Sequence, residues 1–162
     1  MTGLGRRVAG LLHAGDLVLL SGDLGAGKTT LTRGIGEALG VRGAVTSPTF
    51  VLAREHPSLT GGPPLVHVDA YRLESFDEVE GLDLESSLEE AVTVVEWGEG
   101  LVEGLSGDRL EVRLRRPRGG ARVQAADPDE PDDEPRTVTL RGVGKRWAGV
   151  ELPATGLVRP GG

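Results

Sequence analysis

Apolar runs and alternating positions predict a series of short strands. Residues 17–20 and 91–96 are almost uninterrupted apolar runs, which is typical of strands buried on both faces of a sheet. The run at 65–69 is similar and, like 91–96, ends on an acidic residue. Apolar and charged residues alternate between 110 and 115, which predicts a strand with one exposed face. Further strands are expected after a turn within 45–52 and over 137–141.

Three segments have a pattern that favours helices. Residues 28–39 place apolar side chains on one helix face, and Gly40 follows where a helix end is expected. Helices are also expected over about 3–13 and 75–90, the second with a potential break at Gly81. Because strands alternate with helices along the chain, the sequence predicts an α/β fold.

The chain fits one domain with two irregular segments. Residues 1–152 contain all the predicted elements and are long enough to bury a core. Residues 116–135 lose apolar content and gather Gly, Pro, Asp and Glu, so we expect a mobile acidic loop there. The residues 153–162, rich in Gly and Pro, predict a disordered tail.

The composition argues against several classes of protein. The chain of 162 residues carries a formal net charge of −7, which argues against a free-standing nucleic-acid binder. It contains no cysteine, which excludes disulfides, thiolate metal sites and a cysteine nucleophile. Its apolar runs fall short of the roughly 18 residues of a membrane helix, and its first residues lack a signal-peptide pattern. We therefore expect a cytoplasmic protein without membrane association.

A glycine-rich segment before the helix at 28–39 matches the P-loop pattern Gly-x-x-x-x-Gly-Lys-Thr. Its residues are Gly22, Asp23, Leu24, Gly25, Ala26, Gly27, Lys28 and Thr29. An ordinary turn is the alternative, since the chain has 26 glycines. However, only two lysines occur, and the other, Lys145, follows a turn that opens no predicted helix. The strand before the loop and the helix after it favour a phosphate-binding loop.

The residue types of this loop suit a polyphosphate bound with Mg²⁺. Backbone N–H groups in such a loop, together with the positive end of the following helix, form an anion-binding nest. Gly25 and Gly27 let the backbone approach a phosphate where a Cβ atom would intrude. Lys28 can then reach the β and γ phosphates, and the Thr29 hydroxyl can bind Mg²⁺.

Two acidic residues, Asp69 and Glu96, end predicted strands. Ligands of open α/β sheets bind at the carboxyl ends of strands, so both acids could lie beside the P-loop. One would bind Mg²⁺ and the other would orient an attacking water; the alternative is a pair of solvent-facing turn residues. Since the chain contains no asparagine, the Asn-Lys-x-Asp signature that reads guanine is missing. ATP is therefore the expected nucleotide.

Four motifs occur in an order that resembles one family. They are the P-loop at residues 22–30, Ser47-Pro48-Thr49-Phe50, His67-Val68-Asp69-Ala70-Tyr71-Arg72-Leu73 and Val95-Glu96-Trp97. Over about residues 17–113 the chain resembles the bacterial TsaE (YjeE) family. That family is the ATPase subunit of the machinery that makes threonylcarbamoyladenosine beside the anticodon of tRNA.

The resemblance implies a fold, partners and residue roles. The fold is a single P-loop NTPase domain with a mixed, largely parallel central sheet flanked by helices. The partners are TsaB and the catalytic subunit TsaD, and tRNA is reached indirectly through this complex. The implied roles are ATP binding from Gly25 to Thr30, nucleotide contact at Trp97, Mg²⁺ binding at Thr29 and Glu96, a Walker-B-like acid at Asp69 and a switch residue at Thr49.

Three functions stay open from the sequence. By analogy with other P-loop switches, an ATPase would order residues 46–50 on binding ATP and would reset its complex on slow hydrolysis. A small-molecule kinase would use residues 115–122 as an Arg-rich lid, with Asp69 contacting the acceptor. A non-catalytic adaptor would bind ATP without hydrolysing it.

Basic residues gather late in the chain. Because charged and apolar residues alternate over 110–115, these arginines are expected to line the solvated face of an edge strand. The alternative is that they contact a phosphate-bearing partner. Arg136, beyond the acidic segment, is a further candidate to face the nucleotide. The clustered residues are Arg109, Arg113, Arg115, Arg116, Arg118 and Arg122.

Overall fold

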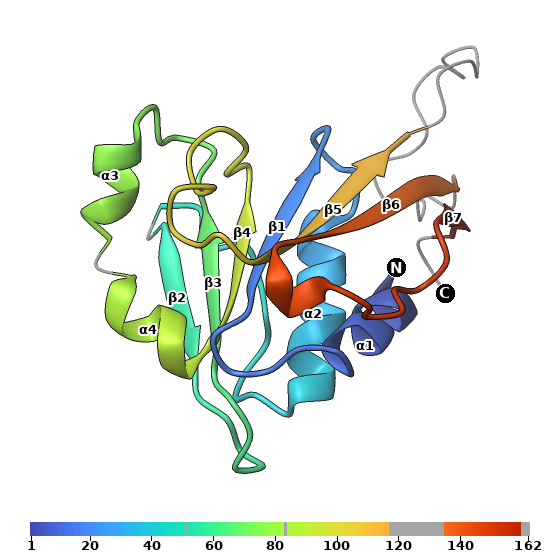
Figure 1. Ribbon diagram of the computed structural model, residues 1–162, viewed down its shortest axis with the longest axis horizontal. Helices are drawn as coiled ribbons and strands as arrows, with labels where there is room; N and C mark the ends of the chain where they lie inside the picture. Colours follow the sequence, from blue (N-terminus) through green and yellow to red (C-terminus); the bar gives the residue numbers. More distant parts are fainter. Residues whose placement is uncertain (51, 83, 117–134, 160–162) are drawn as a thin grey trace.

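The computed structural model describes residues 1–50, 52–82, 84–116 and 135–159. In this part of the chain the strands form one seven-stranded sheet, in the order β2-β3-β4-β1-β5-β6-β7 (Figure 1). The four central strands are parallel neighbours: β3 (Leu65–Asp69), β4 (Val92–Glu96), β1 (Leu17–Gly22) and β5 (Arg109–Arg115). Antiparallel strands flank them: β2 (Ala53–His56), β6 (Arg136–Val143) and β7 (Gly156–Val158). This mixed, mostly parallel sheet with helices confirms the predicted fold class.

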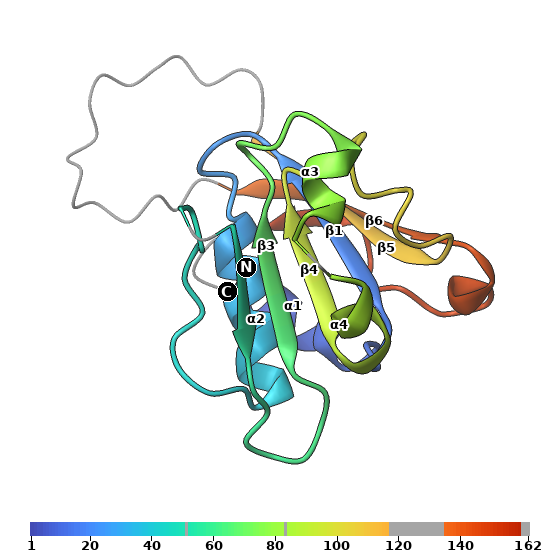
Figure 2. The ribbon, with the colours of Figure 1, turned by 90° about the vertical axis from the view of Figure 1, so that its left-hand side faces the viewer.

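Helices cover both faces of the sheet (Figure 2). On one face α1 (Thr2–Ala9) packs along α2 (Lys28–Leu39) so closely that a Cβ atom at Gly5 would lie 2.9 Å from the Cα atom of Gly34. On the other face lie α3 (Phe76–Glu80) and α4 (Glu85–Glu90), and the 3₁₀ turn η1 (Lys145–Trp147) follows β6. None of the helices in the described ranges has the length and apolar character needed to cross a membrane.

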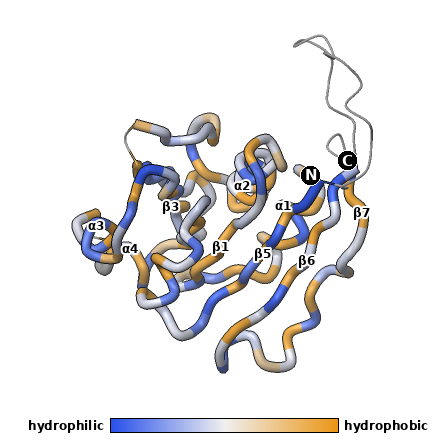
Figure 3. The backbone as a smooth tube through the Cα atoms, turned by 90° about the horizontal axis from the view of Figure 1, so that it is seen from above, coloured by the Kyte–Doolittle hydropathy of each residue, from blue (hydrophilic) through white to orange (hydrophobic). Residues whose placement is uncertain are grey.

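Two hydrophobic clusters hold these layers together. One lies between the sheet and the pair α1 and α2, and contains Val18, Leu20, Leu31 and Ile35. The other lies under α3 and α4. Because β1 contributes to both clusters, its continuous apolar run is explained. The outer positions of β5 and β6 are largely exposed, so both strands alternate in polarity (Figure 3).

Several boundaries differ from the prediction. The helix expected over 75–90 is divided at Gly81, where a potential break was expected: Ser75 begins α3 with a capping box and Gly81 ends it. The first helix ends at Ala9 instead of 13, with Gly10 as its C-cap. The strand expected within 45–52 begins only at Ala53.

The irregular segments had different outcomes. A disordered tail was expected over 153–162, but Gly156–Val158 pair with β6 as β7, so the prediction is wrong for these residues. The expected mobile acidic loop falls mainly on residues 117–134, which lie outside the described residues.

Candidate functional site

The P-loop lies at the centre of the sheet edge where the parallel strands end. Strand β1, between β4 and β5, ends at Gly22, and α2 begins at Lys28. Gly25 has φ 71° and Gly27 has φ 103°, a left-handed region that glycine enters without a steric penalty. Gly27 is also the N-cap of α2 and offers no side-chain acceptor to the first N–H groups of the helix. The loop therefore presents a helix N-terminus suited to an anion.

Lys28 is held inside this loop. Its side chain is only 4% exposed, and Nζ donates hydrogen bonds to the carbonyl oxygens of Gly22 (2.6 Å) and Asp23 (3.0 Å). The ammonium also lies 3.6 Å from the ring centroid of Trp97. Burial lowers the pKa of Lys28, and the nearby charges of Glu96 and other acids offset part of this effect. A poorly solvated cation of this kind favours an incoming phosphate.

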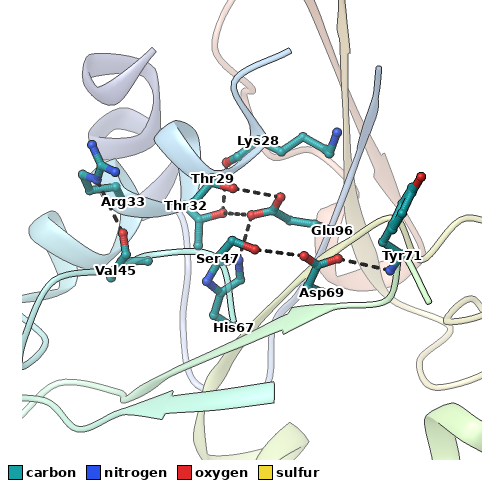
Figure 4. A network of polar contacts seen from close by, with 10 residues as sticks. All are labelled: Lys28, Thr29, Thr32, Arg33, Val45, Ser47, His67, Asp69, Tyr71 and Glu96. Carbon is teal, nitrogen blue, oxygen red and sulfur yellow. Dashed lines mark hydrogen bonds and ion pairs between the residues drawn. The ribbon is translucent and has the colours of Figure 1, made fainter. Parts of the chain in front are cut away.

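The register of the parallel strands brings the two predicted acids beside the P-loop. Asp69 on β3 is the direct neighbour of Glu96 on β4, and Glu96 in turn neighbours Leu20 on β1. The Thr29 hydroxyl, at the start of α2, donates to Oε2 of Glu96 at 3.1 Å (Figure 4). The two expected Mg²⁺ ligands therefore lie within hydrogen-bonding distance of each other.

The second oxygen of Glu96 has partners of its own. His67 Nε2 lies 2.7 Å from Oε1, and both side chains are buried, with 0% and 3% of the side chain exposed. The Thr32 hydroxyl lies 3.5 Å from the same oxygen and donates to the carbonyl oxygen of Lys28 at 3.1 Å. Figure 4 shows Thr29, Thr32 and His67 pointing toward the Glu96 carboxylate. This carboxylate is thus held on both oxygens.

Asp69 belongs to a separate set of contacts. Ser47 Oγ donates to Oδ2 at 2.9 Å, and the backbone N–H of Tyr71 donates to Oδ1 at 3.1 Å. The Tyr71 ring packs edge-on against Trp97, with centroids 5.0 Å apart. Since each acid has its own donors, the two neighbouring carboxylates are oriented independently.

Thr49 is not brought into this network. Its side chain is exposed and makes no hydrogen bond in the described part of the chain. Its backbone has φ 37°, and Leu52 has φ 65°, conformations that cost free energy for residues other than glycine. Phe50, between them, is 80% exposed, and the Arg72 guanidinium stacks over its ring. The expected switch segment is thus strained at Thr49, and it contacts Asp69 through Ser47.

The arginine cluster is divided by the structure. The expected edge strand is wrong, because β5 lies between β1 and β6. On it, Arg109 pairs with Glu111, and both side chains are half-buried. Arg113, Arg115 and Arg116, by contrast, line a cleft of about 670 Å³ together with Gly22, Asp23 and Trp97. Arg116 donates to the carbonyl oxygen of Gly25 at 3.2 Å. Arg136 is buried at the start of β6, while Arg118 and Arg122 lie outside the described residues.

The sequence motifs gave no role to four residues of this site: Ser47, His67, Tyr71 and Thr32. Ser47, His67 and Tyr71 lie in the motifs on which the family resemblance rests, but roles were assigned only to neighbouring residues of those motifs. The alternation of β3 does place His67 on the same face as Asp69, and Thr32 is one helical turn beyond Thr29. These periodicities were signals that could have found both residues.

The donor set fits Mg²⁺. The Thr29 hydroxyl and the Glu96 carboxylate are hard oxygen donors, which this ion prefers. Mg²⁺ usually takes one or two protein oxygens and completes its shell with phosphate and water. Thr29 and Glu96, next to an anion-binding loop, are the residues that would hold it.

Substitution of Gly27 by alanine is expected to reduce both stability and ATP binding. A non-glycine residue in this left-handed conformation costs roughly 1–2 kcal/mol of unfolding free energy. The new methyl group and the shifted N-cap should also weaken ATP binding about tenfold, or ~1.4 kcal/mol. Denaturant unfolding and calorimetric titration measure the two effects.

Gly43 provides the matched control for Gly27. It has φ 80°, lies beyond the other end of α2, and a Cβ atom there would meet nothing within 4 Å. Gly43→Ala should therefore lose similar stability while ATP affinity is unchanged. Equal loss of affinity in both variants would show that backbone strain, and not the P-loop, controls binding.

Comparison with known proteins agrees with this geometry. The family model "Threonylcarbamoyl adenosine biosynthesis protein TsaE" matches residues 1–123. The protein of Streptomyces coelicolor named "tRNA threonylcarbamoyladenosine biosynthesis protein TsaE" is 62% identical over 153 residues, covering 94% of this chain and 97% of that protein. The Bacillus subtilis protein of the same name is 36% identical over 144 residues, covering 89% and 80%.

A solved structure supports the same family for the fold. The crystal structure of YdiB from Bacillus subtilis superposes with a TM-score of 0.65 at 32% sequence identity, covering 91% of this chain and 81% of that one. The family model, the similar sequences and this structure all extend over most of the chain. The protein therefore belongs to the TsaE family and has its P-loop NTPase fold.

Proposed function

We propose that this protein binds Mg-ATP and hydrolyses it as a subunit of the system that makes threonylcarbamoyladenosine in tRNA. The observation that carries the proposal is the 3.1 Å contact between Thr29 Oγ1 and Glu96 Oε2 at the start of a P-loop helix. The family and the names of the relatives support the pathway. A role in tRNA biosynthesis would place the protein in the cytoplasm.

Each part of the site has a task in this proposal. The N–H groups of the loop and Lys28 bind the β and γ phosphates. Thr29 and Glu96 hold Mg²⁺, which when bound neutralises charge on the phosphates. Asp69, which accepts hydrogen bonds from Ser47 and the Tyr71 N–H, would orient the attacking water. Trp97 lies against Lys28 and would border the nucleotide.

The segment 46–50 couples the site to partners in this proposal. Ser47 joins the segment to Asp69, while Thr49 and Phe50 are exposed. Bound ATP would draw Thr49 toward the γ phosphate and change the surface around Phe50, as in other P-loop switches. TsaD and TsaB are the proposed partners, tRNA is reached through them, and hydrolysis resets the complex.

Two measurements test the proposal. The ATPase rate should be slow for the isolated protein and rise at least tenfold with TsaB and TsaD, because partners that complete a P-loop site accelerate hydrolysis. Depletion of the protein from cells should remove threonylcarbamoyladenosine from total tRNA, measured by nucleoside analysis. Unchanged tRNA would refute the pathway, and ATP that stays intact for hours with both partners would indicate a non-catalytic adaptor.

A small-molecule kinase is the second candidate, because of one observation. Arg113, Arg115 and Arg116 line a cleft of about 670 Å³ that borders Gly22 and Asp23 of the P-loop. Such a cleft could clamp a phosphorylated acceptor. Mass spectrometry after incubation with ATP and a metabolite extract distinguishes the two, since only a kinase yields new phosphorylated metabolites.

A further inference from the structure

We infer that His67 is a positioning residue that fixes the Glu96 carboxylate for Mg²⁺. The inference rests on the proposed binding of Mg-ATP and names a residue outside the phosphate loop on which that binding depends. It starts from the shortest polar contact of Glu96, the 2.7 Å distance between His67 Nε2 and Glu96 Oε1. Neither side chain is open to solvent.

The direction of this hydrogen bond follows from its partners. An ionised carboxylate only accepts, so the hydrogen lies on Nε2 of His67. The other contact to the same oxygen, from Thr32, is longer at 3.5 Å, and that hydroxyl also donates to the Lys28 carbonyl. His67 is therefore the main group that holds Oε1. With Oε1 occupied, Oε2 remains directed at Thr29, where the ion would bind.

Burial of an imidazole at this position has a cost that packing alone does not explain. Within the described residues, Nδ1 of His67 is buried without a hydrogen-bond partner. A buried polar atom without a partner loses its hydrogen bond to water without compensation, a cost that an apolar residue of similar size would avoid. The contact with Glu96 is thus the feature that distinguishes histidine from leucine at this place in β3.

Orientation matters here because two acids lie side by side. Asp69 and Glu96 occupy neighbouring positions on parallel strands, which lie about 4.8 Å apart. Without a donor on Oε1, Glu96 could rotate away from Asp69 and lose its alignment with Thr29. Partners that orient a ligand in this way commonly contribute 10–100-fold to metal affinity.

The test measures ATP affinity by calorimetry in excess Mg²⁺ and in excess EDTA, for wild type and two variants. His67→Leu should reduce the ratio of the dissociation constant in EDTA to that in Mg²⁺ at least tenfold. The affinity for ATP in EDTA should stay within about twofold of wild type, because the phosphate loop is intact. His67→Gln, whose amide N–H can reach Oε1, should restore most of the ratio. The Mg²⁺ concentration that gives half of the maximal increase in ATP affinity should rise in His67→Leu and return toward the wild-type value in His67→Gln.

A second buried histidine serves as the control. His56 on β2 is 4% exposed, and its Nδ1 lies 3.3 Å from the carbonyl oxygen of Arg42, not from the acids. His56→Leu removes a buried imidazole without touching Glu96, so it should keep the wild-type ratio. Thermal melts of all variants report any structural cost separately from the dependence on Mg²⁺.

The outcomes separate this inference from the proposed function. A wild-type ratio in His67→Leu, or equal losses in Mg²⁺ and EDTA, would show that His67 is only structural and overturn the inference. Failure of His67→Gln to recover would also overturn it. Absence of ATP binding by the wild-type protein would refute the proposed function and the inference with it.

Discussion

Lys28→Met is expected to weaken ATP binding by roughly 100-fold, or about 3 kcal/mol, because it removes the buried charge proposed to face the phosphates. The loss should be similar in Mg²⁺ and in EDTA, since in the proposed complex the ammonium would contact phosphate and not the ion. Methionine retains most of the apolar stem of lysine. Calorimetric titration with ATP in both conditions measures the effect.

The same variant should also lose the part of the pH dependence of stability that Lys28 contributes. Burial lowers the pKa of Lys28 below its ordinary value of 10.5, so the folded protein binds this proton less tightly than the unfolded chain. In the pH window between the lowered value and 10.5 the unfolded chain carries more protons, and the stability of the folded state rises with pH. Below that window burial of the charge costs stability. Methionine removes this cost together with the hydrogen bonds from Lys28 to the carbonyl oxygens of Gly22 and Asp23.

Unfolding and binding measurements together test this pair of effects. Denaturant unfolding at neutral pH and at about pH 10 should show a smaller gain of stability with pH in Lys28→Met than in the wild type. Lys145→Met is the matched control, because Lys145 is the other lysine of the chain and is exposed in η1. Lys145→Met should change neither the affinity for ATP nor the gain of stability with pH. If Lys28→Met unfolds at neutral pH, the lysine is structural and the proposed phosphate contact loses its support.

The sequence was most informative where structure is local. The unit of β1, P-loop and α2 was predicted closely, with α2 at 28–39 as expected, because apolar periodicity and glycine positions act over a few residues. The convergence of Asp69 and Glu96 was also within reach. Parallel strands end at one sheet edge, so acids at strand ends approach each other whatever the connecting segments do.

Contacts between distant segments needed the structure. Thr29 and Glu96 are 67 residues apart and His67 and Glu96 are 29 apart, so their pairing depends on which strands are neighbours and in what register. Composition also gave a wrong prediction for Gly156–Val158, which it assigned to a disordered tail. Few apolar residues predict little burial, but an edge strand such as β7 is held mainly by backbone hydrogen bonds to β6. Those bonds are independent of side-chain type.

Glu96→Gln is expected to reduce the proposed ATPase rate, measured with the proposed partners TsaB and TsaD present, by about 100-fold or more. Glutamine has nearly the shape of glutamate, and its carbonyl oxygen can still accept from His67, but it has no charge for Mg²⁺. Loss of this charge should remove the tightening of ATP binding by Mg²⁺. Affinity in EDTA should stay close to wild type, because the P-loop is unchanged.

This pattern differs from that of Lys28→Met, which loses affinity in both conditions. Together the two variants therefore separate the phosphate contact from the metal contact. Glu111→Gln is the control for the lost charge: Glu111 lies on β5, pairs with Arg109, and should keep the wild-type rate and Mg²⁺ dependence. If Glu96→Gln also retains the wild-type rate, Glu96 holds no ion in the active complex. In that case its short contacts with Thr29 and His67 only stabilise the junction of β4 and α2.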